Sequence, residues 1–348
     1  MQKLAICAMV MLLISTLHAG SNISPQVLAN SLVQEANAHQ FHPTGVASYG
    51  LVGDLNGSNF TTYQIATNSI YGCVKASSLK AHDSNSMATL RNAAGIQLNT
   101  YLIINGTDGT SYSYFLQNFA ILDTASMWVG FGDQITNTTS LSGGRLSGIS
   151  SDTLSGNGII NNVPTGSWYS NVYLLPGNES NYTLPFSYCP ITIVDVRDGY
   201  PYVRYGYVSN GAVINIDTVA FNISSRSAYL LVSPYRFTPQ GTDYDAEFTF
   251  GGDSGGANVT FSSLNASNMW IFYGSNGTFK PFPSVYPFGI STIEGTDNLR
   301  AEPSGNYVSM GIGKPNLFDS IVLTGQGNGT AIYSRTSNPG TSNESGSG

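Results

Sequence analysis

Hydrophobic and polar positions alternate in short runs along most of the chain. From Pro43 onward, β-branched and aromatic residues alternate with polar ones, and clusters of Gly, Asn, Asp and Ser interrupt the runs about every eight to twelve residues. This period is typical of strands that bury one face. The strands predicted most clearly cover residues 96–104, 112–122, 202–208, 212–222, 227–233, 244–251 and 269–273.

This pattern predicts an all-β protein with an antiparallel β-sandwich architecture. All-β domains often run long, so a region of about 300 residues can form one large sandwich or two stacked ones. We expect two stacked sandwich halves, residues 43–150 and 151–333, within one β-rich domain. They would meet in the stretch 140–166, which is rich in Gly, Ser and Asn.

The first residues show a continuous apolar run instead of alternation. Lys3 supplies a positive start, residues 4–17 form the run, and Ala19 provides a small residue for cleavage before Gly20. Residues 1–19 are therefore expected to be a signal peptide of a secreted or cell-surface protein; an uncleaved anchor is the alternative. No later run reaches the roughly 18 apolar residues of a membrane span, so none is expected in the mature chain.

Helical spacing is found only in the segment that follows. Val27, Leu28, Leu32 and Val33 recur with helical period after Pro25. We interpret residues 20–42 as a propeptide or a short N-terminal helical arm. Residues 334–348 are polar and of low complexity, so we expect a disordered tail.

The chain contains few charged residues. They make up 9% of the sequence against roughly 25% in ordinary globular proteins, while 41% is hydrophobic and the net charge is −7. In strong acid, carboxylates are neutral and Lys and Arg are positive, so a chain with few cations has little self-repulsion. This favours an acidic environment; a neutral-pH glycoprotein is the alternative. The negative charge and the absence of a basic cluster argue against nucleic acid as a partner.

Cysteines and glycosylation motifs also fit an exported protein. Cys7 belongs to the expected signal peptide, which leaves Cys73 and Cys189 as a candidate disulfide in an oxidising exterior. Asn-X-Ser/Thr motifs are frequent. The glycosylation sites that we select are Asn105, Asn137, Asn222, Asn258 and Asn276.

Two short motifs are typical of other protease classes. The segment GGDSGG contains the string around the nucleophile of chymotrypsin-like serine proteases, which makes Ser254 a candidate with His82 and Asp123 as partners. A Gly-rich hairpin turn is the simpler interpretation, and an imidazole is protonated in acid. The segment AILDTAS at 120–126 is similar to the Asp-Thr-Gly loop of pepsin-like enzymes, with Asp253 as a second carboxyl. Turns after strands explain both aspartates equally well.

A more extensive similarity covers about residues 43–315. The chain resembles the thermopsin family of acid endopeptidases in six segments that occur in the family's order. They are PTGVASYGL (43–51), AGIQLNTYLIIN (94–105), YSYFLQNFAI (112–121), INIDTVAF (214–221), DYDAEFTFGG (243–252) and FGISTIEGTDNL (288–299). The resemblance implies a secreted endopeptidase that is active in strong acid, acts on proteins or peptides, and needs no metal or other cofactor. We expect a monomer.

The acidic residues of these segments are the first candidates for catalysis. Acid proteolysis needs a carboxyl that activates water and a donor that polarises the scissile carbonyl. We expect Glu247 and Glu294 to form the carboxyl pair and Asp217 to support them. Gln117 or Gln97 would be the oxyanion donor. Gln97, Asn99 and Asp245 are the expected substrate-binding residues.

Strand alternation also predicts the face of the strand on which the Glu247 side chain lies. Asp245, Glu247 and Thr249 share one face of their strand, and the other face, Ala246, Phe248 and Phe250, is core. We therefore expect Glu247 to be open to substrate.

Two functions without catalysis remain as alternatives. A structural or adhesive glycoprotein of the cell envelope would share the β-sandwich, the glycosylation motifs and the polar tail. A carbohydrate-binding module is suggested by 21 Tyr and 3 Trp, although core packing accounts for most aromatic side chains.

Overall fold

The computed structural model describes residues 45–53, 60–84, 90–142, 145–162, 171–233, 244–253, 258–283, 285, 295–304, 307–314 and 344–345. Strands connected by turns and loops form this part of the chain, and no helix occurs in it. The expected signal peptide and the helical arm over 20–42 lie outside the described residues. Within the described residues, no helix is long and apolar enough to cross a membrane.

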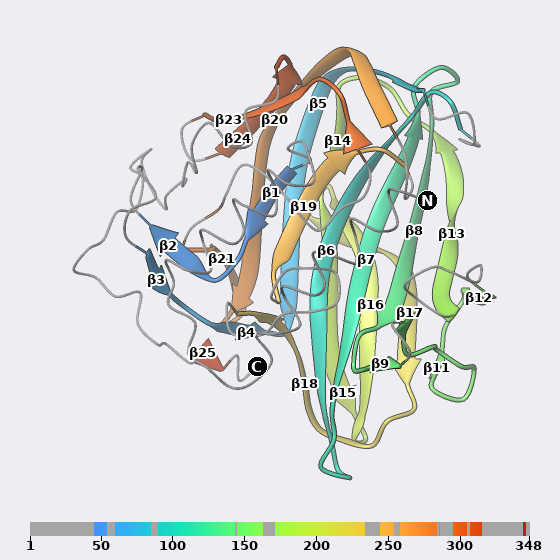
Figure 1. The fold of residues 1–348 in the computed structure, drawn as a ribbon, viewed down its shortest axis with the longest axis vertical. Coiled ribbons are helices and arrows are strands. Elements are labelled where there is room, and N and C mark those ends of the chain that lie inside the picture. Colours follow the sequence, from blue (N-terminus) through green and yellow to red (C-terminus); the bar gives the residue numbers. More distant parts are fainter. Residues whose placement is uncertain are drawn as a thin grey trace.

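The first sheet contains ten strands (Figure 1). Its central strand β6 pairs with β7 along one edge, and with β19 and β18 along the other. In spatial order the main path is β12 (Ile159–Asn162), β13 (Asn171–Asn181), β8 (Trp128–Asn137), β7 (Ser111–Asp123), β6 (Ala93–Gly106), β18 (Ser225–Val232), β4 (Ile65–Thr67) and β25 (Glu344–Ser345), with β19 (Ala246–Gly251) on β6 and β1 (Gly45–Ser48) on β19.

The second sheet contains eleven strands, with β5 and β20 at its centre. Its main path is β11 (Leu154–Ser155), β17 (Ala212–Phe221), β16 (Tyr200–Ser209), β15 (Pro190–Arg197), β5 (Ser69–Asp83), β20 (Asn258–Ser275), β24 (Tyr307–Ile312) and β23 (Leu299–Ser304), with β14 (Phe186–Tyr188) on β5 and both β21 (Thr278–Pro281) and β22 (Gly295–Thr296) on β20. Two small ribbons join β2 (Leu51–Gly53) to β3 (Phe60–Thr62) and β9 (Leu141–Ser142) to β10 (Arg145–Leu146).

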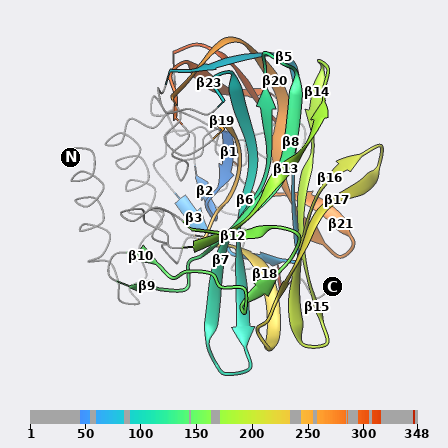
Figure 2. The same ribbon diagram turned by 90° about the vertical axis from the view of Figure 1, so that its right-hand side faces the viewer.

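The two sheets pack face to face, as Figure 2 shows from the side. One apolar core lies between them and draws Leu98 and Phe248 from the first sheet and Val203 and Trp270 from the second. Nearly all pairings are antiparallel, the exceptions among the described strands being β20 with β22 and β25 with β4. The prediction of an antiparallel all-β sandwich is therefore confirmed.

The seven clearest strand predictions all fall on observed strands or overlap them. The strands of the expected halves are distributed over both sheets: β5 comes early in the chain, yet lies between β15 and β20 in the second sheet. The reason is that alternation predicts a strand but not its neighbours, which depend on contacts far apart in sequence. The division at residue 150 stays a prediction.

Tight turns hold the hairpins in the second sheet. The turns Asp198–Gly199, Asn210–Gly211 and Asn276–Gly277 join β15 to β16, β16 to β17 and β20 to β21, and each residue in them has positive φ. Asn-Gly and Asp-Gly are the preferred pairs for this turn because Gly has no Cβ and Asn and Asp tolerate the left-handed region. These Asn-Gly and Asp-Gly pairs therefore set the register of the three hairpins.

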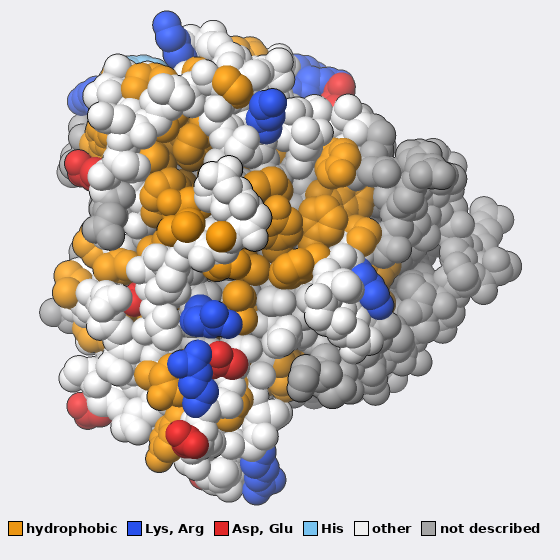
Figure 3. All heavy atoms as spheres, turned by 180° about the vertical axis from the view of Figure 1, so that it is seen from behind, with side chains coloured by type: hydrophobic (Ala, Val, Ile, Leu, Met, Phe, Trp, Pro, Cys, Tyr) orange, Lys and Arg blue, Asp and Glu red, His pale blue; other side chains and the backbone are white. Residues whose placement is uncertain are grey.

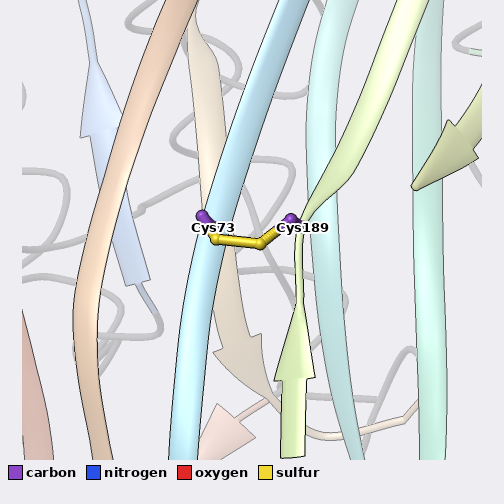
Figure 4. Close-up of a disulfide and its surroundings, with 2 residues drawn as sticks. All are labelled: Cys73 and Cys189. Carbon is purple, nitrogen blue, oxygen red and sulfur yellow. A yellow bond between two sulfur atoms is a disulfide. The ribbon is translucent and has the colours of Figure 1, made fainter. Parts of the chain in front are cut away.

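A disulfide joins Cys73 of β5 to Cys189, which lies between β14 and β15 (Figure 4). The two Cα atoms are 4.0 Å apart. The bond links segments 116 residues apart within the second sheet.

The back of the molecule in Figure 3 is the outer face of the second sheet, where hydrophobic side chains gather and charged side chains of both signs lie between them. The large hydrophobic residues exposed on the strands of this sheet are Val196, Tyr200, Val213, Ile214, Phe279, Tyr307 and Ile312.

Candidate active site

A row of polar side chains crosses the outer face of the first sheet. Glu247 on β19, Asn99 on β6, Gln117 on β7 and Gln134 on β8 are successive cross-strand partners. Their neighbours Phe248, Leu98, Asn118 and Asp133 point to the opposite face, toward the second sheet, where Asn118 donates to the carbonyl oxygens of Ile191 and Gly206. We call Glu247, Asn99, Gln117, Gln134 and the adjacent Gln97 the polar row.

Hydrogen bonds connect the polar row from one end to the other. Gln134 Nε2 donates to Gln117 Oε1 at 2.8 Å, and Gln117 Nε2 donates to Gln97 Oε1 at 2.8 Å and to Asn99 Oδ1 at 3.4 Å. Asn99 Nδ2 lies 3.5 Å from Glu247 Oε2, a long contact. The structure thus brings together four of the residues selected from the sequence, Gln97, Asn99, Gln117 and Glu247.

The polar row is buried at the Glu247 end and more open at the other. Glu247 is 0% exposed, Asn99 1% and Gln97 6%, whereas Gln117 and Gln134 are half-buried. The expectation that Glu247 is open to substrate is therefore wrong for this structure. Alternation identified its face correctly, but both faces of β19 are buried, and strand period does not report what covers the second face.

An aromatic cluster lies beside the polar row on the same face. The Tyr101 ring is 5.1 Å from that of Phe115 and 5.4 Å from that of Tyr244, centroid to centroid. Ile103 and Leu231 complete the cluster. Since Tyr101 and Phe115 follow Asn99 and precede Gln117 by two positions, apolar surface adjoins the amides directly.

A second group of acids lies between the sheets. Asp133 on β8 and Asp217 on β17 are both 0% exposed, and we call them the interior acid pair. Asp217 accepts hydrogen bonds from the Tyr173 hydroxyl, from the Asn157 amide at 3.2 Å and from the Thr218 amide at 2.7 Å. Neither carboxyl oxygen of Asp133 has a hydrogen-bond partner in the described part of the chain.

Burial and mutual repulsion change the ionisation of this group. Burial, together with the charge of Asp217, raises the pKa of Asp133 to about 8. Burial also raises the pKa of Tyr205 well above its usual value, and the charges of Asp133 and Asp217 add to the effect. The pKa of Tyr173 is raised by burial and by its hydrogen bond to Asp217. Asp133 therefore stays protonated throughout the acidic range.

The structure does not bring Asp217 to the polar row. Asp217 belongs to the second sheet and faces the interior, and the first sheet lies between it and Glu247. The geometry therefore disagrees with the expected role of Asp217 as support for Glu247. The sequence could not show this, because a strand pattern does not identify the sheet to which a strand belongs. Asp245 is buried immediately before β19. Glu294 lies outside the described residues.

Among the residues of the two other protease motifs, some lie on a strand or close a turn, and Ser254 lies outside the described residues. His82 is exposed on β5, and Ser254 is outside the described residues. Asp123 Oδ1 accepts from the amides of Ala125 and Ser126, so it closes a turn. Although burial raises the pKa of Asp123, these hydrogen bonds outweigh it and the pKa is lowered. Burial raises the pKa of Asp253.

The selected glycosylation sites differ in exposure. Asn222, Asn258 and Asn276 are exposed, whereas Asn105 and Asn137 are half-buried. Among the described residues, no three His, Cys, Asp or Glu side chains come together as a metal site.

Sequence reasoning missed two residues of these groups, Gln134 and Asp133. Both lie on β8, which was not among the clearest strand predictions. The available signal was an acid followed by an amide within the alternating segment WVGFGDQITN, because polar groups inside a strand need partners.

Comparison with known proteins agrees with the ordered segments found in the sequence. The sequence model of the thermopsin family matches residues 26–299. Thermopsin from Sulfolobus acidocaldarius is 32% identical over 287 residues, which cover 80% of this chain and 80% of that protein. The family match spans β1 to β19 and so includes every strand of the polar row. The chain therefore belongs to the thermopsin family, and this membership supports a peptidase.

Proposed function

We propose that the protein is a secreted acid endopeptidase in which the Glu247 carboxyl activates the attacking water. The observation that carries the proposal is the pairing of this carboxyl with the Asn99 amide at the head of the polar row. Family membership supports a peptidase, and the low content of charged residues supports work in acid.

The polar row has the groups that peptide hydrolysis in acid requires. In its ionised form Glu247 takes a proton from water as the water oxygen attacks the peptide carbonyl carbon. An amide N–H of Asn99 or Gln117 donates to the oxyanion that forms, and the proton on Glu247 then passes to the leaving amine. Amides suit this role because they remain neutral donors at every pH of interest. Glu294 as a second carboxyl stays part of the proposal.

Burial sets a condition on this mechanism. Since Glu247 is 0% exposed, a substrate reaches it only when the surface over the Glu247 end opens, while Gln117 and Gln134 are already half-exposed. The aromatic cluster offers apolar surface next to the amides for an extended peptide.

The test is proteolysis of an unfolded protein substrate by the secreted protein from pH 1 to pH 7. We expect cleavage below about pH 4, and Glu247→Gln should lower it about 100- to 10,000-fold, the usual range for a general base. Ser254→Ala is the control and should leave acid cleavage unchanged. Inactivity over the whole range would instead favour an envelope glycoprotein, and activity that rises toward neutral pH and is lost with Ser254→Ala would favour a serine protease.

A further inference from the structure

Three amides of the polar row, those of Gln134, Gln117 and Asn99, donate in the same direction. Starting from Gln134, the Nε2 or Nδ2 of each of these residues points toward the next one on the Glu247 side, and the oxygens of Gln117 and Asn99 accept from the residue before them. The bond from Gln134 to Gln117 is 2.8 Å long, and the bond from Gln117 to Gln97 is equally short. Gln134 is thus the first donor of the series.

The direction of such a series depends on its first donor. A primary amide has an oxygen on one side and an NH₂ group on the other, and a half-turn exchanges them. While Gln134 donates to Gln117 Oε1, the NH₂ group of Gln117 must face Gln97 and Asn99, whose oxygens accept from it. Asn99 then presents its own NH₂ group to Glu247.

Without the Gln134 donor, Gln117 can turn over. Its oxygen would then face the oxygens of Gln97 and Asn99, and relief of that repulsion would turn Asn99 so that its carbonyl oxygen faces the Glu247 carboxyl. An N–H directed at a carboxylate stabilises the ionised form, whereas a carbonyl oxygen repels it. The half-buried setting makes these orientations matter, because water competes less with the amides there.

We propose that Gln134 is a positioning residue for the reaction. It fixes the orientation of Gln117 and, through Gln117, presents the NH₂ group of Asn99 to Glu247. The inference rests on the proposed function, since it assigns Gln134 a role in the same site. Gln134 lies three strands away from Glu247 and touches no reacting atom in this scheme.

The experiment compares Gln134→Leu and Gln134→Glu in the secreted protein by kcat and KM between pH 2 and about pH 4, the range in which we expect cleavage. Leu has nearly the same volume and cannot donate, so kcat should fall about tenfold, as expected for the loss of one good hydrogen bond, while KM changes little. A protonated Glu carries an O–H that donates to Gln117 Oε1. Gln134→Glu should therefore stay within about threefold of the wild type at pH 2 and lose activity relative to it as the pH rises toward about 4, where Glu begins to ionise.

Controls separate this inference from the proposed function. Gln64→Leu, the same change at a half-buried glutamine outside the polar row, should leave kcat unchanged. Asp133 lies next to Gln134 but faces the interior, and it is present in every variant, so its titration cancels in the ratio to wild type. Equal melting temperatures of the variants at pH 2 exclude a loss of folding.

Two results would overturn the inference. One is a wild-type kcat for Gln134→Leu. The other is an equal deficit of the Leu and Glu variants at every pH, which would indicate packing instead of hydrogen bonding. If wild type is active and Glu247→Gln is inactive in the same assay, either result removes the role of Gln134 alone. If Glu247→Gln keeps full activity, the proposed function fails as well.

Discussion

The polar row and the interior acid pair lie on opposite sides of the first sheet and use opposite chemistry. On β7 and β8, Gln117 and Gln134 face outward, while their chain neighbours Asn118 and Asp133 face the second sheet. The outer group consists mainly of neutral amides in one connected series. The inner group places two carboxyls in the buried core, and one of them has no hydrogen-bond partner among the described residues.

Because of this difference, we expect the two regions to respond differently to pH. A series of amides changes neither charge nor donor capacity with pH, so it can hold a geometry under strongly acidic conditions. A buried carboxyl without a partner is tolerated only while it is protonated, because burying a charge costs far more than burying a neutral group. We therefore expect the outer face to govern activity and the inner face to govern how stability depends on pH.

The largest expected effect is a loss of stability as the pH rises. Because the pKa of Asp133 is about 8 in the folded state and roughly 3.9 unfolded, the folded protein binds the extra proton between these values. This contribution to stability is then fully present below about pH 4. Between about pH 4 and about pH 8 it is lost, and the equilibrium constant for unfolding rises by up to tenfold per pH unit. The total is on the order of 5 kcal/mol, measured by urea denaturation at successive pH values.

Two variants test this assignment. Asp133→Asn keeps the shape and cannot ionise, so the pH dependence above pH 4 should flatten and the variant should exceed the wild type in stability at pH 7. Asp123→Asn is the control with the opposite sign: the pKa of Asp123 is lowered, so its contribution is present above its unfolded pKa and is lost as the pH falls. A slope that survives in Asp133→Asn would mean that another group is responsible.

The next effect separates two adjacent residues that face opposite ways. Asn118 donates to two carbonyl oxygens of the second sheet at 3.0 and 2.8 Å and accepts from the Tyr188 hydroxyl at 3.0 Å. Asn118→Leu leaves these buried groups unsatisfied and should lower the free energy of unfolding by about 3 kcal/mol. Gln117→Leu should cost less than about 1 kcal/mol but lower kcat about 100-fold, as expected for an oxyanion donor.

Denaturation curves and acid proteolysis measured on both variants decide the matter. If Gln117→Leu unfolds the protein and Asn118→Leu spares it, the two faces have been assigned the wrong way round. If both variants are stable and fully active, neither face has the role that we give it.

The sequence predicted local features of this arrangement well and long-range ones poorly. Alternation identified β6, β7, β17 and β19, and the thermopsin-like segments led to Glu247, Asn99 and Gln117. All of these rest on residues a few positions apart. Strand β5 was missed because small and polar residues occupy much of it, although it lies at the centre of the second sheet.

The errors share a physical cause. The burial of Glu247, the position of Asp217 and the meeting of Asp217 with Asp133 all depend on which strands become neighbours and which sheet covers which face. Side-chain period specifies that a strand has two faces, but not what each face meets. The raised pKa of Asp133 could not be foreseen for the same reason, since Asp217, whose charge adds to it, lies 84 positions further along the chain, in the other sheet.

The smallest effect concerns the hydroxyl that connects β13 to the interior acid pair. Tyr173 donates to Asp217 and accepts from the Gly158 amide at 2.6 Å, and it is 1% exposed. Tyr173→Phe removes both bonds with little change in shape and should lower the free energy of unfolding by about 1 to 3 kcal/mol. Since Tyr173 faces the interior, kcat at pH 2 should stay within about twofold of the wild type. A collapse of kcat without a loss of stability would show that the interior acids take part in the reaction, and it would end the division between an outer face for chemistry and an inner face for stability.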